Sequence, residues 1–350
     1  MSLSPIADPV NRRILAVAED ALSGFDARPF RAIGERCGLD EADVLERISA
    51  MLAAGTILRL RQITPSTALT HGCLIAWQVP EPDAAFEWLS RHDPATGHIV
   101  IRRALDAAAP GADYRLWTTL KLPASADAHA HCERLATAIG ATNYARMPVV
   151  GMFALSVGHI RRAGLPPGTL LPEAPVMQVP PSPTLSPAEH AVLQAFREPL
   201  GAHELAPEPW VGRAQALGME PQAFYALAHA LVQKGALGRF AAVLNHTLPP
   251  NRHTGTGSSA LFMWAVRPGQ EEAAGAVCGR HVCMTHCYWR AGAERFGGVQ
   301  IMGVVHAPEL DELLAHKAAI DAALSRHGIE LRHSAVLLTE RALVKPSRLG

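Results

Sequence analysis

Apolar and polar residues follow the same succession of patterns twice along the chain. Apolar residues at helical spacing, such as Val44, Ile48 and Met51, predict helices, and period-two runs predict strands. Aligning AGTILRL with KGALGRF gives an internal repeat offset by about half the chain. Each copy is typical of a helix-turn-helix followed by a β wing. The expected helices are residues 11–22, 29–37, 41–54, 186–196, 214–217 and 221–234, and the wing strands are 57–63 and 237–246.

After each wing, alternating strands and helices follow in the order β-α-β-β-α-β, which is the ferredoxin-like pattern. The runs CLIAWQV, GHIVIRR and DYRLWTTLKL predict strands in the first half, and ALFMWAV, MTHCYWR, VQIMGVVH and SAVLLTE predict strands in the second. We therefore expect an α+β fold, built as a tandem repeat of a winged helix-turn-helix and a ferredoxin-like domain.

A proline-rich segment separates the two halves. Residues 163–187 hold eight of the 27 prolines, and proline fixes φ and removes a backbone donor, so the segment predicts an extended linker. The expected boundaries are 10–64 and 68–162 in the first half, 163–187 for the linker, and 188–240 and 241–345 in the second half.

Composition and charge exclude several classes of protein. Apolar residues make up 49% of the 350 residues and charged residues 18%, which excludes a disordered chain. Lys plus Arg and Asp plus Glu both total 32, so the basic surplus that a phosphate-binding protein usually carries is missing. The N-terminus lacks the apolar core of a signal peptide, and no apolar run is long enough to span a bilayer. We expect a cytoplasmic protein with reduced thiols and no membrane partner.

A winged helix joined to a ferredoxin-like domain resembles the Lrp/AsnC regulators, which bind DNA and sense amino acids. The third helix of each motif argues against DNA binding, because a reading helix needs basic or amide side chains on its exposed face. Residues 41–54 instead offer Glu41, Asp43 and Glu46 against Arg47, and residues 221–234 are nearly neutral. We expect no nucleic-acid partner, and a regulator or heme-responsive sensor stays the alternative.

Several motifs, in the same order along the chain, resemble siroheme decarboxylases, the Lrp-like enzymes of heme d1 biosynthesis and of the alternative heme route. DYRLWTTLKLP is similar to their YNLWFTL strand, GHIVIRR to HNYLR with His98 on the family histidine, and MPVVGMFALSVG to RMFKIGV. In the second half, GRFAAVLNH is similar to RFGAVLRH, THCYWR to SHCYRR, and VVH to MIH. The tail SAVLLTERALVKPSRL resembles LFSTRRFKQRGARY.

The resemblance implies removal of CO₂ from acetate side chains of siroheme to give didecarboxysiroheme. It implies no cofactor beyond the iron of the tetrapyrrole substrate. The two halves are expected to pair with each other, and a homodimer stays open. The chain departs from the family pattern where Arg115 replaces the motif asparagine, where Gln300 stands at the matching place, and where Ile99 and Val100 replace Asn and Tyr. The first half could therefore be a structural partner without its own active site.

Such a site must hold a polyanionic macrocycle and protonate the carbon left after loss of CO₂. Arginine pairs with carboxylates through its planar fork, and histidine titrates near working pH. Period-two alternation on MTHCYWR predicts Met284, His286, Tyr288 and Arg290 on one strand face.

The candidate residues come from both halves. His246, His286 and Tyr288 are the candidates for catalysis, with His246 or His286 as an alternative ligand of the substrate iron. The candidates for substrate binding are Arg239, Arg290, His98 and Arg102. His253 lies in a Gly/Ser-rich loop and is slightly disfavoured as an iron ligand.

A cluster of cysteines and histidines in the second half also invites a metal interpretation. Cys283 and Cys287 share one strand face while His286 points to the other, which disfavours a structural zinc or iron–sulfur site. The cysteines are expected to be small buried apolar residues, and no resident metal is predicted.

Overall fold

The computed structural model describes residues 6–65, 70–123, 126–155, 158–162, 164–245 and 257–345. The chain divides into two compact units. Unit 1 comprises Met1–Thr67, Val157–Ala163 and Pro181–Thr256, and unit 2 comprises Ala68–Ser156, Gly164–Pro180 and Gly257–Gly350. Each unit therefore collects segments from both halves of the sequence.

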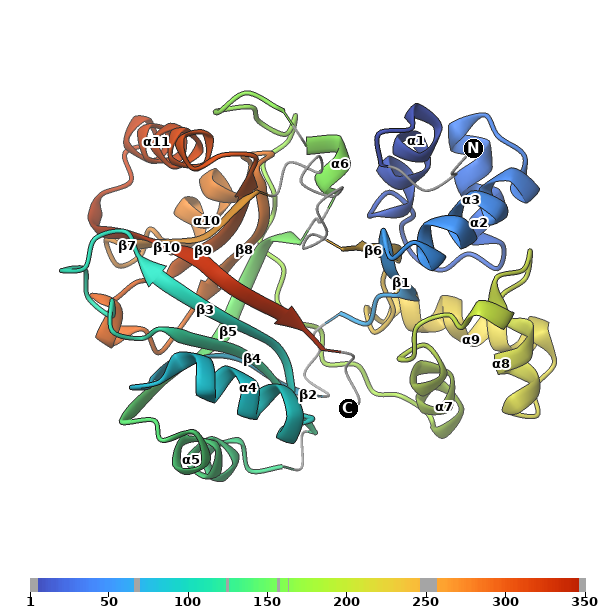
Figure 1. Cartoon of the computed structure of the whole chain (residues 1–350), viewed down its shortest axis with the longest axis horizontal. Helices are drawn as coiled ribbons and strands as arrows, with labels where there is room; N and C mark the ends of the chain where they lie inside the picture. Colours follow the sequence, from blue (N-terminus) through green and yellow to red (C-terminus); the bar gives the residue numbers. More distant parts are fainter. Residues whose placement is uncertain are drawn as a thin grey trace. The chain divides into compact units, whose positions relative to one another are not determined.

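Unit 1 holds the helix-turn-helix segments of both halves. The first half contributes α1 (Pro9–Ala18), α2 (Pro29–Cys37), α3 (Glu41–Ala53) and strand β1 (Ile57–Gln62). The second contributes α7 (Pro187–Ala195), α8 (Val211–Ala216), α9 (Pro221–Gln233) and strand β6 (Phe240–Leu244), and the short helix α6 spans His159–Arg162. The two wing strands pair with each other in an antiparallel two-stranded ribbon (Figure 1).

Local sequence signals fix the ends of these helices. Asp8 caps α1 by accepting hydrogen bonds from the backbone N–H groups of Val10 and Asn11. Ser186 and Glu189 form a reciprocal capping box at the start of α7. Gly55 and Gly235 follow α3 and α9 at positive φ, where glycine carries no Cβ penalty, and each turn leads toward a wing strand.

Unit 2 repeats the order β-α-β-β-α-β. The first copy is β2 (Thr70–Gln78), α4 (Pro82–His92), β3 (Thr96–Ala104), β4 (Leu116–Pro123), α5 (Ala128–Ile139) and β5 (Asn143–Leu155). The second copy is β7 (Ser258–Val266), α10 (Glu271–Gly279), β8 (Met284–Arg290), β9 (Ile301–Ala307), α11 (Leu310–Arg326) and β10 (Leu331–Val344).

The eight strands of unit 2 close into one antiparallel barrel in the order β10-β3-β4-β2-β5-β8-β9-β7. The two copies use equivalent strand orders, β3-β4-β2-β5 and β8-β9-β7-β10. They join at the β5–β8 and β10–β3 seams. The sequence predicts a separate ferredoxin-like domain in each half, whereas the chain joins both sets of strands edge to edge. Closure leaves no sheet edge among these strands.

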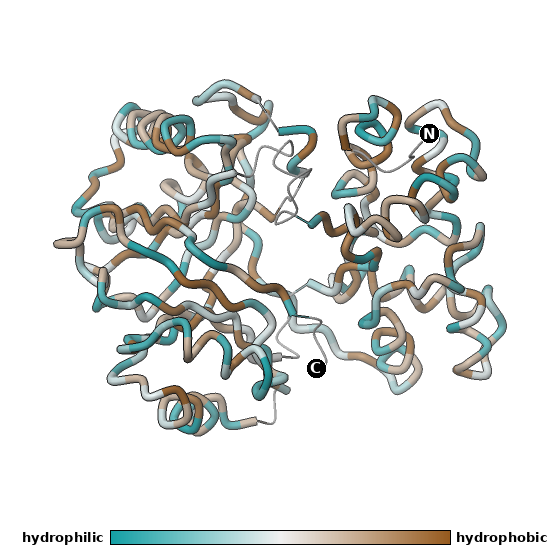
Figure 2. The backbone as a smooth tube through the Cα atoms, in the orientation of Figure 1, coloured by the Kyte–Doolittle hydropathy of each residue, from teal (hydrophilic) through white to brown (hydrophobic). Residues whose placement is uncertain are grey.

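Strand alternation divides the apolar residues of unit 2 into three cores. One core fills part of the barrel interior, around Trp117, Met263 and Phe296. A second core lies between the strands and helices α10 and α11, and a third lies under α4 and α5. Figure 2 shows hydrophobic and hydrophilic residues interspersed along the barrel strands. The helices thus cover the outside of the barrel, and the interior face remains available for both packing and chemistry.

Part of the proline-rich segment after the first half packs on unit 2. Gln178 exchanges two backbone hydrogen bonds of 2.8 Å with Met152 of β5. The backbone N–H of Leu171 donates to the carbonyl of Arg280 at 2.8 Å. Residues 164–180 are therefore part of the barrel unit rather than a free connection.

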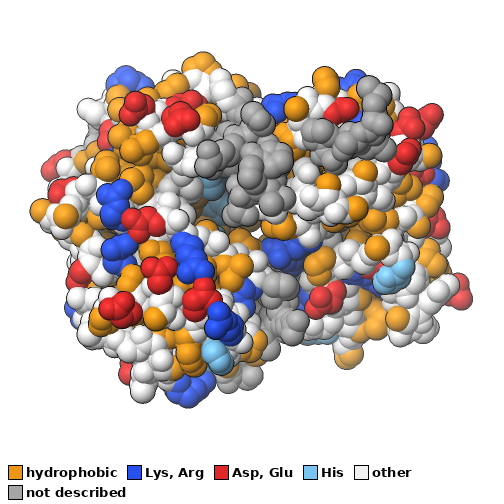
Figure 3. Space-filling model, viewed as in Figure 1, with side chains coloured by type: hydrophobic (Ala, Val, Ile, Leu, Met, Phe, Trp, Pro, Cys, Tyr) orange, Lys and Arg blue, Asp and Glu red, His pale blue; other side chains and the backbone are white. Residues whose placement is uncertain are grey.

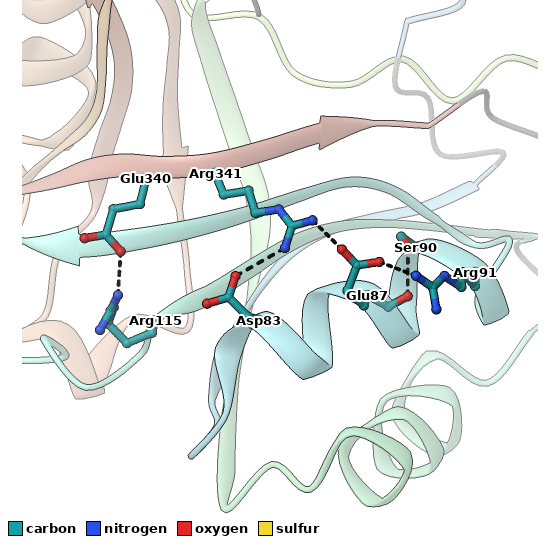
Figure 4. A network of polar contacts seen from close by, with 7 residues as sticks. All are labelled: Asp83, Glu87, Ser90, Arg91, Arg115, Glu340 and Arg341. Carbon is teal, nitrogen blue, oxygen red and sulfur yellow. Dashed lines mark hydrogen bonds and ion pairs between the residues drawn. The ribbon is translucent and has the colours of Figure 1, made fainter.

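A polar network lines the outside of the β10–β3 seam. Arg341 pairs with Asp83 and Glu87 of α4 (Figure 4). Its guanidinium lies 4.1 Å from the Phe86 ring centroid. Glu340, its neighbour on β10, pairs with Arg103 and Arg115. On the visible face of unit 2, basic and acidic side chains are interspersed, in keeping with the balanced composition (Figure 3).

Candidate active site inside the barrel

Strand β8 turns three polar side chains toward the barrel interior. Cys287 and Trp289 pack in the core under α10 and α11, so the alternate residues His286, Tyr288 and Arg290 face inward. The prediction that these three share a face is correct. Including Met284 in the same set is wrong, because the pairing shifts between Met284 and His286, and Met284 packs in the outer core.

Strand β3 carries an equivalent pair of residues. Val100 and Ala104 belong to the interior core and Ile99 and Ile101 to the outer one, so His98 and Arg102 also face inward. Aligning GHIVIRR with THCYWR matches His98 with His286 and Arg102 with Arg290.

The strand pairing agrees with this alignment. Arg102 lies opposite Thr339 of β10, and Arg290 lies opposite Val149 of β5. Strands β10 and β5 are the last strands of the two copies. Each half therefore places a histidine and, four residues later, an arginine on the inner face of its second strand.

Arg102 is a buried cation whose side chain donates a hydrogen bond to a hydroxyl group. Its side chain is 7% exposed, and Nη1 donates to the Thr339 Oγ1 at 2.9 Å. The Nε atom is buried without a hydrogen-bond partner. Burial lowers the pKa of the guanidinium to about 10. No carboxylate of the described residues forms an ion pair with Arg102.

Arg290 is similarly buried, at 8% exposed. Its Nη1 donates to the backbone carbonyl of Met147 at 2.8 Å, and its guanidinium lies 4.6 Å from the centroid of the Tyr288 ring. The rings of Tyr288 and His286 are stacked with centroids 6.1 Å apart. Burial lowers the pKa of Arg290, while Tyr288 and Cys73 act in the opposite direction. Within the described ranges, no Asp or Glu forms an ion pair with it.

Two buried arginines, neither paired with a carboxylate of the described residues, indicate which kind of ligand this interior would favour. Removing a charge from water costs several kcal/mol unless an opposite charge or full hydrogen bonding compensates for it. A ligand that carries carboxylates would supply that compensation through forked, charge-assisted hydrogen bonds. The geometry therefore favours a polyanionic ligand with an apolar body, because the neighbouring interior residues are apolar.

Sequence reasoning did not select two further inward-facing residues, Lys121 and His306. Lys121 shares its strand face with Trp117, and His306 shares its face with Met302. The two occupy equivalent places on β4 and β9, since Lys121 lies opposite Gly72 and His306 opposite Ser259. The period-two alternation of TTLKLP and GVVH in the sequence could have placed these two residues on the inward faces of their strands.

Two predicted residues belong to other parts of the chain. Arg239 immediately precedes β6 in unit 1, so it is not on the barrel strands. His246 lies outside the described residues, as does His253. The pairing of His246 with His286 therefore stays a prediction.

Two of the positions that depart from the family pattern, Arg115 and Gln300, make hydrogen bonds to the strand backbone. Arg115 donates from Nε to the backbone carbonyl of Arg102 at 2.6 Å and pairs with Glu340 at 2.5 Å. Gln300 exchanges hydrogen bonds with the backbone of Val266. Both side chains thus contact the backbone of a neighbouring strand residue.

The described part of the chain contains no group of three His, Cys, Asp or Glu residues arranged to hold a metal ion. All six cysteines are free. Burial raises the pKa of the Cys278 and Cys287 thiols, so these are protonated apolar side chains in the outer core. None of the described helices combines the length and the apolar character needed to cross a bilayer.

Comparisons with known proteins agree with the motifs. A family model described as the siroheme decarboxylase NirDL-like HTH domain matches residues 12–57. The siroheme decarboxylase NirDL subunit of Paracoccus pantotrophus is 25% identical over 291 residues, covering 81% of this chain and 80% of that protein. The siroheme decarboxylase of Hydrogenobacter thermophilus is 24% identical over 309 residues, covering 86% of this chain and 85% of that protein.

The fold agrees as well. The crystal structure of the siroheme decarboxylase NirDL superposes with a TM-score of 0.65 at 18% identity, covering 97% of this chain and 93% of that one. A second structure, of NirDL in co-complex with an iron-uroporphyrin III analogue, gives a TM-score of 0.64. The chain is thus a mixed α/β protein with a helix-turn-helix domain and the NirDL fold. Its sequence is similar to those of proteins named siroheme decarboxylases, in agreement with the motifs.

Proposed function

We propose that the chain is a siroheme decarboxylase, a carboxy-lyase that removes CO₂ from acetate side chains of siroheme to give didecarboxysiroheme for heme d1 or alternative heme biosynthesis. Relatives of this name cover most of the chain. The observation that carries the proposal is the matched pair of inward-facing His and Arg residues on β3 and β8. Both arginines are buried, and neither pairs with a carboxylate of the part of the chain that the structure describes.

Each residue type has a role in this chemistry. Arg102 and Arg290 would hold substrate carboxylates through forked hydrogen bonds. In the reaction, the bond between the acetate CH₂ and its carboxylate breaks, CO₂ leaves, and the electron pair stays on the carbon. A proton delivered to that carbon then gives a methyl group. His286 is the candidate donor, with Tyr288 stacked against it, because imidazole holds and releases a proton near neutral pH.

The remaining predicted residues complete the proposal. His98, from the first half, and Arg239 would take part in substrate binding, with Arg239 binding a carboxylate. His246 would be a second proton donor or a ligand of the substrate iron. We propose no cofactor beyond that iron, which belongs to the substrate. The proposed location is the cytoplasm, and assembly as a homodimer is a question for light scattering.

We also propose that the chain is a tandem Lrp/AsnC-like repeat in which each half is a winged helix-turn-helix plus a ferredoxin-like module. The order β-α-β-β-α-β in both copies and the equivalent strand orders support this description. A DNA-binding regulator is the alternative that such a repeat suggests. The exposed Asp43 and Glu46 on α3 disfavour it, because acidic side chains are repelled by phosphates.

The decisive experiment is anaerobic incubation of the purified protein with siroheme, followed by absorbance and product mass. A Soret shift with loss of CO₂ supports the lyase, and the number of molecules lost gives the extent of reaction. A shift with unchanged mass would indicate a binder or a sensor. No shift, together with strong gel-shift binding to DNA at low salt, would favour the regulator.

A further inference from the structure

The ribbon of β1 and β6 in unit 1 has two unlike faces. Leu60 and Gln62 of β1 are fully buried, and Phe240 beside them packs its ring against Phe30 and Trp210. Alternation places Arg59 and Arg61 on the opposite face, across from Val243 and Ala241. The ribbon therefore turns one face toward the helices and presents two arginines on the other.

Neither arginine has an ion-pair partner in the described parts of the chain. The Nε atom of each is shielded from solvent, with no hydrogen-bond partner among the described residues. Burial lowers the pKa of both guanidinium groups, and Arg59 lowers the pKa of Arg61 further. Glu198 acts in the opposite direction on Arg61, more weakly than burial and Arg59 do. Two residues apart on one strand, the side chains start roughly 7 Å from each other.

The repeat places a third arginine on the same face. Arg239 lies opposite Ile63, whose backbone N–H donates a hydrogen bond of 2.8 Å to the Arg239 carbonyl. Ile63 follows Arg61 by two residues, so strand alternation places it, and Arg239 opposite it, on the face of the two arginines. In the alignment of AGTILRL with KGALGRF, Arg59 and Arg239 are equivalent. Both wings thus carry an arginine at the same place, and β1 adds a second one.

We propose that this face, Arg59 and Arg61 of β1 with Arg239, binds carboxylates of a polycarboxylate tetrapyrrole and selects for macrocycles with many carboxylates. The identity of the ligand rests on the function proposed above. Planar guanidinium groups pair with carboxylates in a forked geometry, and a ligand carboxylate would supply the missing opposite charge. Nucleic acid is the weaker candidate, because Asp43 and Glu46 are exposed on α3 of the same unit.

The test is equilibrium binding of two metal-free porphyrins followed by fluorescence, with the full chain. Uroporphyrin III is an octacarboxylate, and protoporphyrin IX is a dicarboxylate. The variants are Arg59→Gln, Arg61→Gln and the double variant, and the matched control is Arg31→Gln, an exposed arginine of α2 that pairs with Glu35. We expect each single variant to weaken uroporphyrin binding about tenfold, since a charge-assisted hydrogen bond is lost. Protoporphyrin binding and the control should change less than twofold.

The outcomes separate this proposal from the proposed enzymatic function. If the double variant binds uroporphyrin within twofold of the wild type, or if the wild type does not bind it, the ribbon proposal is wrong, whatever the siroheme turnover. If the double variant loses uroporphyrin affinity while the wild type fails to decarboxylate siroheme, the ribbon proposal stands and the lyase does not. If circular dichroism shows that the double variant does not fold, the single variants are used instead, and uroporphyrin binding within twofold of the wild type in both of them overturns the ribbon proposal. Loss of duplex DNA binding with unchanged porphyrin binding would overturn the proposal in favour of nucleic acid.

Discussion

Replacing Glu19 by glutamine should stabilise unit 1, and more so as the pH rises. Glu19 follows α1 and is 1% exposed. Its Oε2 accepts a hydrogen bond of 2.8 Å from the backbone N–H of Ile160 in α6. Burial, together with the neighbouring Asp20, raises the pKa of this carboxyl to about 8, although the backbone hydrogen bonds and Arg161 act in the opposite direction. Glutamine keeps the accepting oxygen and removes the ionisation.

The magnitude follows from the difference in pKa between the folded and unfolded chain. Below pH 4.5, Glu19 is protonated in both states and contributes nothing. Between pH 4.5 and about 8, the unfolded chain releases the proton and the folded chain retains it, so stability falls by about 1.4 kcal/mol per pH unit. Between pH 5.5 and 8.5 the wild type should therefore lose about 3 kcal/mol relative to Glu19→Gln.

Thermal unfolding of both proteins at pH 5.5, 7.0 and 8.5 measures this effect. For a unit of this size, about 3 kcal/mol corresponds to a gain in Tm on the order of 10 °C for the variant between the two extremes. Glu35→Gln, at an exposed glutamate of α2, is the control, and its difference from the wild type should not grow in the same way. A Tm difference for Glu19→Gln that is constant across the three pH values would refute the reasoning.

Three further predictions concern unit 2. Arg290→Gln should leave the Tm of the ligand-free protein unchanged or higher, because the variant removes a buried charge that no described carboxylate compensates. It should also weaken siroheme binding about tenfold or more. An absorbance titration that shows retained affinity would contradict the anion-binding role. His286→Ala should lose most turnover, whereas His98→Ala should mainly weaken binding, and wild-type rates in single-turnover assays of both would contradict the assignment. Arg341→Ala should cost about 1 kcal/mol, because its carboxylate pairs are exposed, and the loss should shrink in high salt; a loss of several kcal/mol in urea unfolding would show that these pairs are stronger than surface pairs.

The sequence predicts the order of elements well, because periodicity is a local property. Each predicted strand run in the two halves corresponds to a strand, and the glycine after each third helix ends it as expected. The closure of the barrel could not be predicted in the same way. The β5–β8 and β10–β3 seams join segments more than a hundred residues apart in sequence, and periodicity carries no information about which edge meets which.

The candidate site shows the same division between local and long-range information. Alternation correctly places His286, Tyr288 and Arg290 on one face, and it fails at Met284 because a shift in register is set by the partner strand. The burial of Arg102 could not be inferred either, since it depends on Thr339, which lies more than two hundred residues away and comes to it only through barrel closure.

The departures of the first half from the family pattern indicate how the roles in binding and catalysis would differ between the two halves. Ile99 packs under α4 and α5, so the loss of a polar residue there does not reach the interior. Val100 occupies the inward position that corresponds to Tyr288 of β8. The first half therefore lacks an equivalent of the Tyr288 hydroxyl and of its aromatic ring, which stacks on His286 and lies beside the guanidinium of Arg290. His98 and Arg102 nevertheless keep their inward positions. Both halves therefore place an arginine for binding in the interior, but only the second half adds a tyrosine beside its histidine. For this reason, we expect turnover to depend on His286 more than on His98.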